Sequence, residues 1–156
     1  MTPVTVVLPT WNGERFLAAQ LDSILRDIPS HARLLVRDDG STDHTTEIVR
    51  EFASRDPRIE LLPGGARLGV IRSVEALLAK VEGGAVFLSD QDDLWRPGKV
   101  ARCLDALESA DLVIHDASRI DAEGKPLEGT LFQRRGFGGG VFANAWKNRF
   151  TGCCMA

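Results

Sequence analysis

Three carboxylates fall within four residues at Asp90, Asp92 and Asp93. They follow Ala85 to Ser89, a short apolar run that predicts a buried strand. Like charges at this spacing raise one another's pKa unless a cation neutralises them. Oxygen ligands without a nearby His or Cys pair favour Mg²⁺ or Mn²⁺, which binds one or two carboxylates and completes its shell with substrate phosphates and water. The run therefore predicts a metal site for a diphosphate substrate, although a solvated turn that caps the next helix is an equally simple interpretation of these residues alone.

A second polar loop runs from Asp38 to Asp43, after a short apolar segment. Gly40 permits a tight turn, Asp43 can cap the next helix, and Asp39 is left as a free carboxylate that points into a ligand crevice. Such a carboxylate can accept an N–H of a nucleotide base. The alternative is an ordinary turn between a strand and a helix, and the loop by itself favours that alternative.

A third candidate is Pro9-Thr10-Trp11-Asn12, which follows the apolar run Val4 to Leu8. Asn12 can cap the next helix, while Thr10 and the exposed backbone can face a nucleotide. This signal is weak when it is taken alone.

The elements that must position these loops alternate along the chain. Strands are expected at Val4–Leu8, Leu34–Val36, Ile59–Leu62, Ala85–Ser89 and Leu112–His115. Apolar residues at helical spacing predict intervening helices at Glu14–Arg26, after Asp43, over Val70–Val81, and after Pro97, which would lie in the first turn. The alternation predicts an α/β fold with a mostly parallel sheet flanked by helices. In such a fold ligands bind at the carboxyl ends of the strands, so the three polar loops should converge on one edge.

Composition narrows the class of protein. The chain has 156 residues, 44% hydrophobic and 26% charged, which is typical of one folded domain and excludes a disordered or fibrous protein. A net charge of −3 with scattered basic residues argues against a nucleic-acid partner. Cys103, Cys153 and Cys154 have no metal-ligand spacing and are interpreted as buried thiols of a reducing compartment. No leader or membrane-span pattern is present, so we expect a cytoplasmic protein, with peripheral association at the inner face of the cell membrane left open.

Taken together, three segments resemble the family 2 glycosyltransferases with the GT-A fold. They are Val6 to Asn12, Asp38 to Asp43 and Leu88 to Trp95, and their order and spacing make the resemblance specific over almost the whole chain. The Asp-Gln-Asp-Asp-Leu-Trp version is similar to the branch that includes bacterial rhamnosyltransferases acting on surface polysaccharides. The resemblance implies a Rossmann-like GT-A fold and an inverting transfer of a sugar, rhamnose among the candidates. The donor would be a UDP- or dTDP-sugar and the acceptor a saccharide or lipid-linked saccharide.

The resemblance also implies residue roles. Asp39 would receive the N3–H of uracil or thymine, Arg67 would reach the diphosphate or sugar, and Asp90 would face the ribose or a metal-bound water. The full expected nucleotide set is Pro9, Thr10, Asn12, Asp39, Arg67 and Asp90. Asp92 would be the main ligand of Mg²⁺ or Mn²⁺, with Asp90 beside it and Asp93 supporting the loop. Ser73 stands where relatives often have Asn, which leaves its contact open.

The expected organisation is a single nucleotide-sugar-binding GT-A domain over 1–156. Residues 1–116 would form the donor-binding core, and 117–156 would begin the acceptor side, starting with a hairpin over Ser118 to Leu127. In this family the catalytic base usually lies in the acceptor half, and no residue between Asp116 and Ala156 matches that motif. We therefore expect the base, and a C-terminal part of the protein, to be missing from this chain. The alternative is a non-catalytic nucleotide-sugar-binding module.

Overall fold

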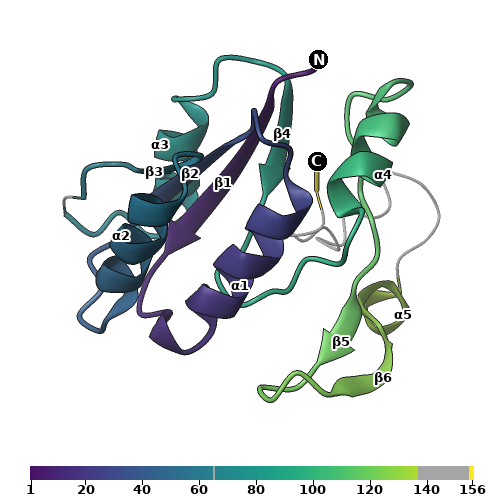
Figure 1. The fold of residues 1–156 in the computed structure, drawn as a ribbon. Coiled ribbons are helices and arrows are strands. Elements are labelled where there is room, and N and C mark those ends of the chain that lie inside the picture. The colour runs from purple at the N-terminus through teal and green to yellow at the C-terminus, as the bar shows by residue number, and fades with distance from the viewer. Residues whose placement is uncertain (65, 137–154) are drawn as a thin grey trace.

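A four-stranded parallel sheet forms the centre of the computed structural model, which describes residues 1–64, 66–136 and 155–156. The strand order is β3-β2-β1-β4 (Figure 1), with β1 at Val4–Thr10, β2 at Arg33–Asp38, β3 at Ile59–Leu61 and β4 at Ala85–Leu88. This arrangement confirms the predicted α/β fold.

Helices cover both faces of this sheet. The elements are α1 at Glu14–Asp27, α2 at Thr45–Arg55, α3 at Val70–Leu78 and α4 at Lys99–Leu107. Because side chains alternate along a strand, Val6 and Leu8 of β1 pack with α1, α2 and α4, whereas Val7 packs with Leu77 of α3 on the other face. A strand buried on both faces is mostly apolar, which is why Val6, Val7 and Leu8 follow one another in β1, with Thr5 as a buried polar residue before them.

The register brings the carboxyl ends of three strands to one edge. Thr10 at the end of β1 lies opposite Asp38 at the end of β2, and Leu88 at the end of β4 lies opposite Val7. The polar loops that follow these strands therefore begin side by side at the lower edge of the sheet in Figure 1.

Beyond α4 the chain forms the predicted hairpin. Strand β5 at Ser118–Ile120 pairs antiparallel with β6 at Pro126–Thr130, and α5 follows at Leu131–Arg135. A capping box starts α5, since the Thr130 hydroxyl accepts from the Gln133 N–H and the Gln133 side chain accepts from the Thr130 N–H.

The strand predicted at Leu112–His115 is wrong for the described residues. This segment forms only an isolated antiparallel bridge between Ile114 and Met155, with Val113 and Ala156 exchanging two backbone hydrogen bonds. A strand requires a partner of matching length, and only two described residues pair with the segment.

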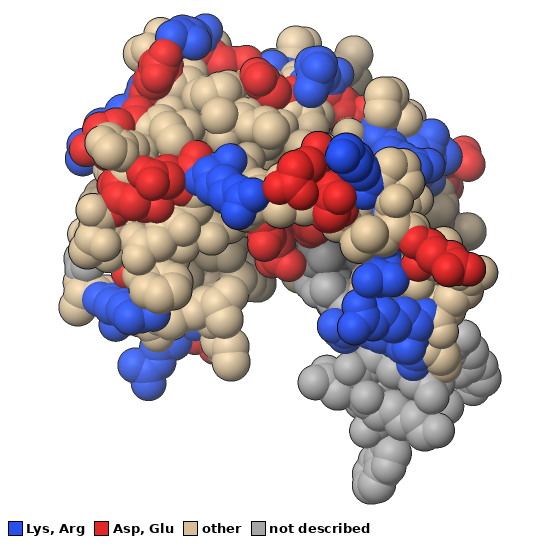
Figure 2. Space-filling model, turned by 90° about the horizontal axis from the view of Figure 1, so that it is seen from below, with Lys and Arg blue, Asp and Glu red and all other residues tan. Residues whose placement is uncertain are grey.

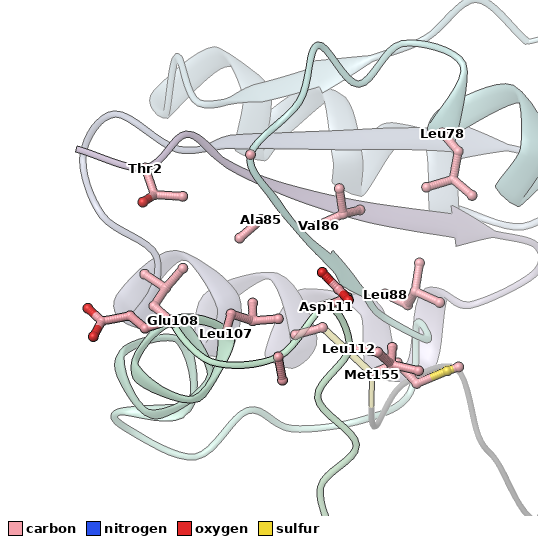
Figure 3. Close-up of a pocket in the computed structure, with 14 residues that line it drawn as sticks. Thr2, Leu78, Ala85, Val86, Leu88, Leu107, Glu108, Asp111, Leu112 and Met155 are labelled. Atoms are coloured by element: carbon pink, nitrogen blue, oxygen red, sulfur yellow. The ribbon is translucent and has the colours of Figure 1, made fainter. Parts of the chain in front are cut away.

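Met155 and Ala156 lie along the edge of β4 that does not pair with β1. There Leu88 N donates to the Met155 carbonyl at 3.3 Å. A mostly apolar cavity of about 590 Å³ adjoins them (Figure 3), with Leu78, Val86 and Leu112 in its wall. It contains none of the predicted site residues.

Two helix boundaries differ from the prediction. Helix α3 ends at Leu78, before Val81. Helix α4 begins at Lys99, two residues after Pro97, because the Asp27 carboxylate of α1 accepts the N–H groups that open it, from Gly98 and Val100.

Cys103 is a buried free thiol, as expected, and burial raises its pKa. Cys153 and Cys154 lie outside the described residues. None of the described helices is long and apolar enough to cross a membrane.

Candidate functional site

The predicted convergence of the polar loops is confirmed by hydrogen bonds between them. In the loop after β1, Asn12 N donates to the Ser41 hydroxyl at 2.8 Å, and the Asn12 side-chain carbonyl accepts from Thr42 N at 2.8 Å. Gly13 N donates to the Thr45 hydroxyl at 2.7 Å. The loops after β1 and β2 therefore form one cross-linked unit.

Two capping predictions are corrected by these contacts. Gly13, not Asn12, is the N-cap of α1, because the Asn12 side chain is turned toward Thr42. Asp43 is not the N-cap of α2, a position that His44 holds; its carboxylate accepts instead from Glu14 N at the start of α1 and from Thr45. Asn12 thus supports the neighbouring loop instead of its own helix, whereas Asp43 joins the start of α1 to the first residue of α2.

Gln91 fastens the acidic loop to the loop after β1. Its side-chain Oε1 accepts from Trp11 N at 2.9 Å, and its Nε2 donates to the Trp11 carbonyl at 3.0 Å. A Cβ atom at Gly13 would overlap the Gln91 amide, so a side chain at this position would displace that amide from its place beside Trp11. We call this pair of reciprocal hydrogen bonds the Gln91 clamp.

Asp38 organises the turn after β2. Its carboxylate accepts from the backbone N–H groups of Gly40 and Ser41, from the Ser41 hydroxyl, and from the Thr10 hydroxyl at 3.1 Å. Thr10 is only 2% exposed, and its buried hydroxyl donates to Asp38, which helps to hold the turn in place. An Asp before Gly-Ser at a strand end is the signal that could have identified Asp38 in the sequence.

Asp39 is not the free carboxylate that the sequence suggested. It is 5% exposed and accepts hydrogen bonds from Arg37 Nη1 at 2.7 Å, Leu68 N at 2.7 Å and Gly69 N at 2.8 Å. Burial alone would raise the pKa of Asp39, but these hydrogen bonds outweigh burial and lower the pKa to about 2. The carboxylate is therefore ionised and tightly held.

Arg37 and Ser73 are site residues that the sequence reasoning missed or left open. Arg37 Nη1 also donates to the Ser73 hydroxyl at 2.7 Å, and both residues are buried. Ser73 thus contacts both members of the buried pair, since its hydroxyl also hydrogen-bonds to Asp39. A charged residue at the end of the apolar strand β2 was the available signal for Arg37.

Arg67 reaches the loop after β1 from the turn before α3. Its guanidinium carbon lies 3.9 Å from the centroid of the Trp11 ring, and Trp11 is 43% exposed. The structure therefore brings Arg67 beside Trp11 and, through the Gln91 clamp, close to the acidic loop.

The three carboxylates of the acidic loop line one cavity. Asp90, Asp92 and Asp93 share a space of about 720 Å³ with Arg15 at the start of α1 and with the β5–β6 hairpin. Figure 2 looks onto this edge of the molecule and shows acidic side chains gathered across its middle, with basic ones beside them.

This donor set suits a small hard cation. In the described part of the chain no three His, Cys, Asp or Glu side chains form a ready metal cage. Mg²⁺ does not need one, because one or two carboxylates suffice when substrate phosphates and water complete its shell. Carboxylates that open onto a shared cavity meet that requirement, with Asp92 the exposed member.

Known proteins with related sequences are glycosyltransferases. The putative teichuronic acid biosynthesis glycosyltransferase TuaG of Bacillus subtilis is 24% identical over 152 residues, which is 96% of this chain and 59% of TuaG. The UDP-Glc:alpha-D-GlcNAc-diphosphoundecaprenol beta-1,3-glucosyltransferase WfgD of Escherichia coli is 32% identical over 97 residues, 62% of this chain and 38% of WfgD. This chain therefore spans about two-fifths to three-fifths of the length of these relatives.

Solved structures show the same fold. S. aureus TarS 1–349 in complex with UDP-GlcNAc superposes with a TM-score of 0.69 at 22% identity, over 85% of this chain and 38% of that one. The mannosyltransferase PcManGT from Pyrobaculum calidifontis, in complex with GDP-Man and Mn²⁺, gives a TM-score of 0.63 at 26% identity, over 76% of this chain and 35% of that one. The fold is thus that of the GT-A enzymes.

The family model of glycosyl transferase family 2 matches residues 5–156. This match covers the sheet, its helices and every loop described above. The chain therefore belongs to glycosyl transferase family 2.

Proposed function

We propose that this chain is the donor-binding part of a metal-dependent inverting glycosyltransferase. It would move a sugar from a UDP- or dTDP-sugar to a saccharide or lipid-linked saccharide during synthesis of a bacterial surface polysaccharide. The observation that carries the proposal is the Gln91 clamp, which holds the acidic loop against the loop after β1. The names of TuaG and WfgD support the polysaccharide context.

The nucleotide would lie against the loops after β1 and β2. Pro9, Thr10 and Asn12 shape this surface, and Asp39 is the acceptor for the base N3–H. Arg37 Nη1 and Leu68 N donate to Asp39 Oδ1, Gly69 N donates to Oδ2, and the Ser73 hydroxyl also hydrogen-bonds to this carboxylate. These donors hold the Asp39 carboxylate in place for a base N–H.

The phosphates would lie between Arg67 and the acidic loop. Asp92 and Asp90 would hold Mg²⁺ or Mn²⁺, and Asp93 would support their loop. When bound, the metal neutralises charge on the departing nucleoside diphosphate. The exposed guanidinium of Arg67 adds a second positive charge on the nucleotide side.

The transfer joins an acceptor oxygen to the anomeric carbon as the bond from that carbon to the phosphate oxygen breaks. The acceptor proton passes to a general base, and in-line attack inverts the anomeric configuration. We assign residues 1–116 to donor binding and 117–156 to the beginning of the acceptor side. The base is assigned to neither segment.

A thermal-stability assay tests the donor site. With Mg²⁺ or Mn²⁺ present, UDP or dTDP at about 100 times its Kd should stabilise the fold by about 2.7 kcal/mol, a rise in Tm of about 5 to 10 °C. GDP and ADP serve as controls for the base, and EDTA as the control for the metal. Absence of any metal-dependent shift with UDP, dTDP or their sugars, dTDP-rhamnose included, would refute the proposal.

The alternative is a non-catalytic nucleotide-sugar-binding module. An assay of sugar transfer distinguishes it from the proposed enzyme. The full-length protein should release UDP or dTDP when an acceptor is supplied. Metal-dependent binding without release under any acceptor would favour the module.

A further inference from the structure

A second cavity adjoins the cavity of the three carboxylates. It measures about 620 Å³ and is bounded by the end of the acidic loop, by α4 and by the segment that leads into β5. Asp93 lines both this cavity and the cavity of the three carboxylates. We call the second cavity the Trp95 pocket. Its volume lies within the range of about 300–1,000 Å³ that is usual for small-molecule sites.

Three buried polar atoms of residues that line this pocket have no hydrogen-bond partner among the described residues. They are Asp93 Oδ2, Trp95 Nε1 and His115 Nε2. Buried polar atoms are nearly always paired, so these three atoms in the wall of one cavity are available to a polar ligand of the pocket.

Trp95 is the most firmly placed of the three. It is 6% exposed, its backbone N donates to the Ser23 hydroxyl at 3.0 Å, and its ring centroid lies 5.8 Å from that of Phe87. The Lys99 ammonium lies 4.0 Å from the Trp95 ring centroid. The indole N–H is therefore held in position by packing on the core side of the pocket.

The orphan atoms specify what a ligand must offer. Trp95 Nε1 is a donor only, and Asp93 Oδ2 accepts as a carboxylate oxygen. His115 Nδ1 lies 2.9 Å from the Asp116 carbonyl oxygen, which can only accept. Nδ1 therefore carries a proton, which leaves Nε2 as the ring nitrogen that can accept a hydrogen bond. A ligand must thus accept one hydrogen bond and donate two.

Hydroxyl groups meet this requirement because each of them donates and accepts. A phosphate oxyanion mainly accepts and a metal ion donates no hydrogen bond, so neither matches two acceptors and one donor. The pocket also has apolar wall in Val113 and Ile120, against which the C–H faces of a sugar ring can pack.

We propose that the Trp95 pocket binds one sugar ring of the acceptor, through hydrogen bonds with Asp93, Trp95 and His115. This inference rests on the proposed glycosyltransferase function and adds a location for its saccharide acceptor. Because Asp93 and five other residues line both cavities, the sugar would be bound next to the cavity of the proposed metal ligands.

The test uses the indole N–H signals in a ¹⁵N-correlated NMR spectrum, since the chain has three tryptophans. The Trp95→Phe and Trp11→Phe variants assign the signals of the two sites. Methyl glycosides of glucose, N-acetylglucosamine and rhamnose are added at increasing millimolar concentrations. At least one glycoside should move the Trp95 signal to saturation. A Trp95 signal that stays in place with all three glycosides overturns the inference.

A histidine pair provides the matched variants. His115→Phe removes the Nε2 acceptor and should raise the glycoside concentration at half-saturation by about tenfold. His31→Phe changes an exposed histidine that contacts the Thr2 carbonyl, far from the pocket. This variant should leave the glycoside concentration at half-saturation unchanged. Equal affinity in the two variants would contradict a role for His115.

The same spectra separate this inference from the proposed function. UDP with diamagnetic Mg²⁺ should move the Trp11 signal, because Trp11 lies beside Arg67 in the proposed nucleotide site. A moved Trp11 signal with an unmoved Trp95 signal overturns only the sugar pocket. A moved Trp95 signal with an unmoved Trp11 signal overturns only the nucleotide assignment.

Discussion

At the scale of single residues, the Gln91 side chain connects two loops that are 80 positions apart in the chain. Its amide is suited to this connection because one end accepts and the other donates, which matches a backbone N–H and C=O. An Asp or Glu side chain at this position would only accept at neutral pH, because an ionised carboxylate has no hydrogen-bond donor. The residue between the two candidate metal ligands is therefore a positioning residue for the proposed reaction.

Replacing Gln91 tests this role. Gln91→Ala and Gln91→Glu should each weaken UDP–Mg²⁺ binding by about fivefold to tenfold, since loss of the clamp frees the acidic loop. Isothermal titration calorimetry measures the affinity, with Gln133→Ala, a change in the exposed cap of α5, as the control. Unchanged affinity in both Gln91 variants would argue that the acidic loop holds its position unaided.

Asp92 is the residue on which metal binding should depend most. Asp92→Ala should abolish metal-dependent binding of UDP or dTDP, because it removes the exposed carboxylate of the acidic loop. Without ligand its unfolding free energy should change by no more than about 0.5 kcal/mol, as is usual for exposed positions. Asp105→Ala, in an exposed position of α4, is the control. Retained affinity with metal in Asp92→Ala would refute the ligand assignment.

The buried pair of Arg37 and Asp39 makes a prediction about pH. Because the folded-state pKa of Asp39 is about 2, against an ordinary value of 3.8, the pair stabilises the fold above about pH 4 and loses this effect as pH falls toward 2. Asp39→Asn should remove this part of the pH dependence. It should also cost about 3–5 kcal/mol at neutral pH, since Arg37 keeps a buried charge without its carboxylate.

Urea unfolding at several pH values measures both effects. The difference in unfolding free energy between wild type and Asp39→Asn should shrink between about pH 4 and pH 2. A constant difference over that interval would show that Asp39 is not ionised in the way we describe.

At the scale of elements, the sequence predicts the strands and helices that lie in the described core. Apolar periodicity identified β1 to β4 and α1 to α4 because each of them buries a continuous face. Convergence of the polar loops followed from parallel strands alone, since their carboxyl ends share an edge.

What the sequence did not predict depends on tertiary partners. Asp39 receives hydrogen bonds from Leu68 N and Gly69 N, about thirty positions along the chain, and no local pattern indicates them. The Asn12 side chain likewise turns to Thr42 instead of to its own helix. Leu112–His115 has an apolar strand pattern, but a strand depends on a partner that its own sequence does not show.

Helix α4 illustrates an element that is fixed by another element. The Asp27 carboxylate of α1 accepts from Gly98 N and Val100 N, so Asp27→Ala should destabilise the protein by about 1 kcal/mol and lower Tm by about 2 to 4 °C. Asp22→Ala, on the exposed face of α1, should leave Tm nearly unchanged. Calorimetry measures both variants, and equal Tm values would argue against the cap.

At the scale of the whole molecule, the chain places two adjoining cavities around one acidic loop. The cavity of the three carboxylates lies between α1, the acidic loop and the hairpin, and the Trp95 pocket lies between the end of that loop, α4 and the hairpin. In the proposed reaction the metal site and the acceptor would therefore adjoin at Asp93.

Completion of the sheet should decide whether the molecule folds. A fragment of residues 1–84 lacks β4 and the core residues Phe87, Trp95 and Val100, so it should show no cooperative unfolding in urea. The complete chain should unfold in one transition. A cooperative transition in the fragment would show that β1 is stable with one neighbour.

The central place of β1 has a consequence for synthesis on the ribosome. Val4 pairs with Ala85, so one edge of a mostly apolar strand stays open until that residue has been made. At about 5–20 residues per second this takes about 4 to 16 seconds. During that interval the nascent chain presents an unpaired strand to its neighbours. Until Ala85 has been made, the growing chain is therefore exposed to aggregation through this open strand edge.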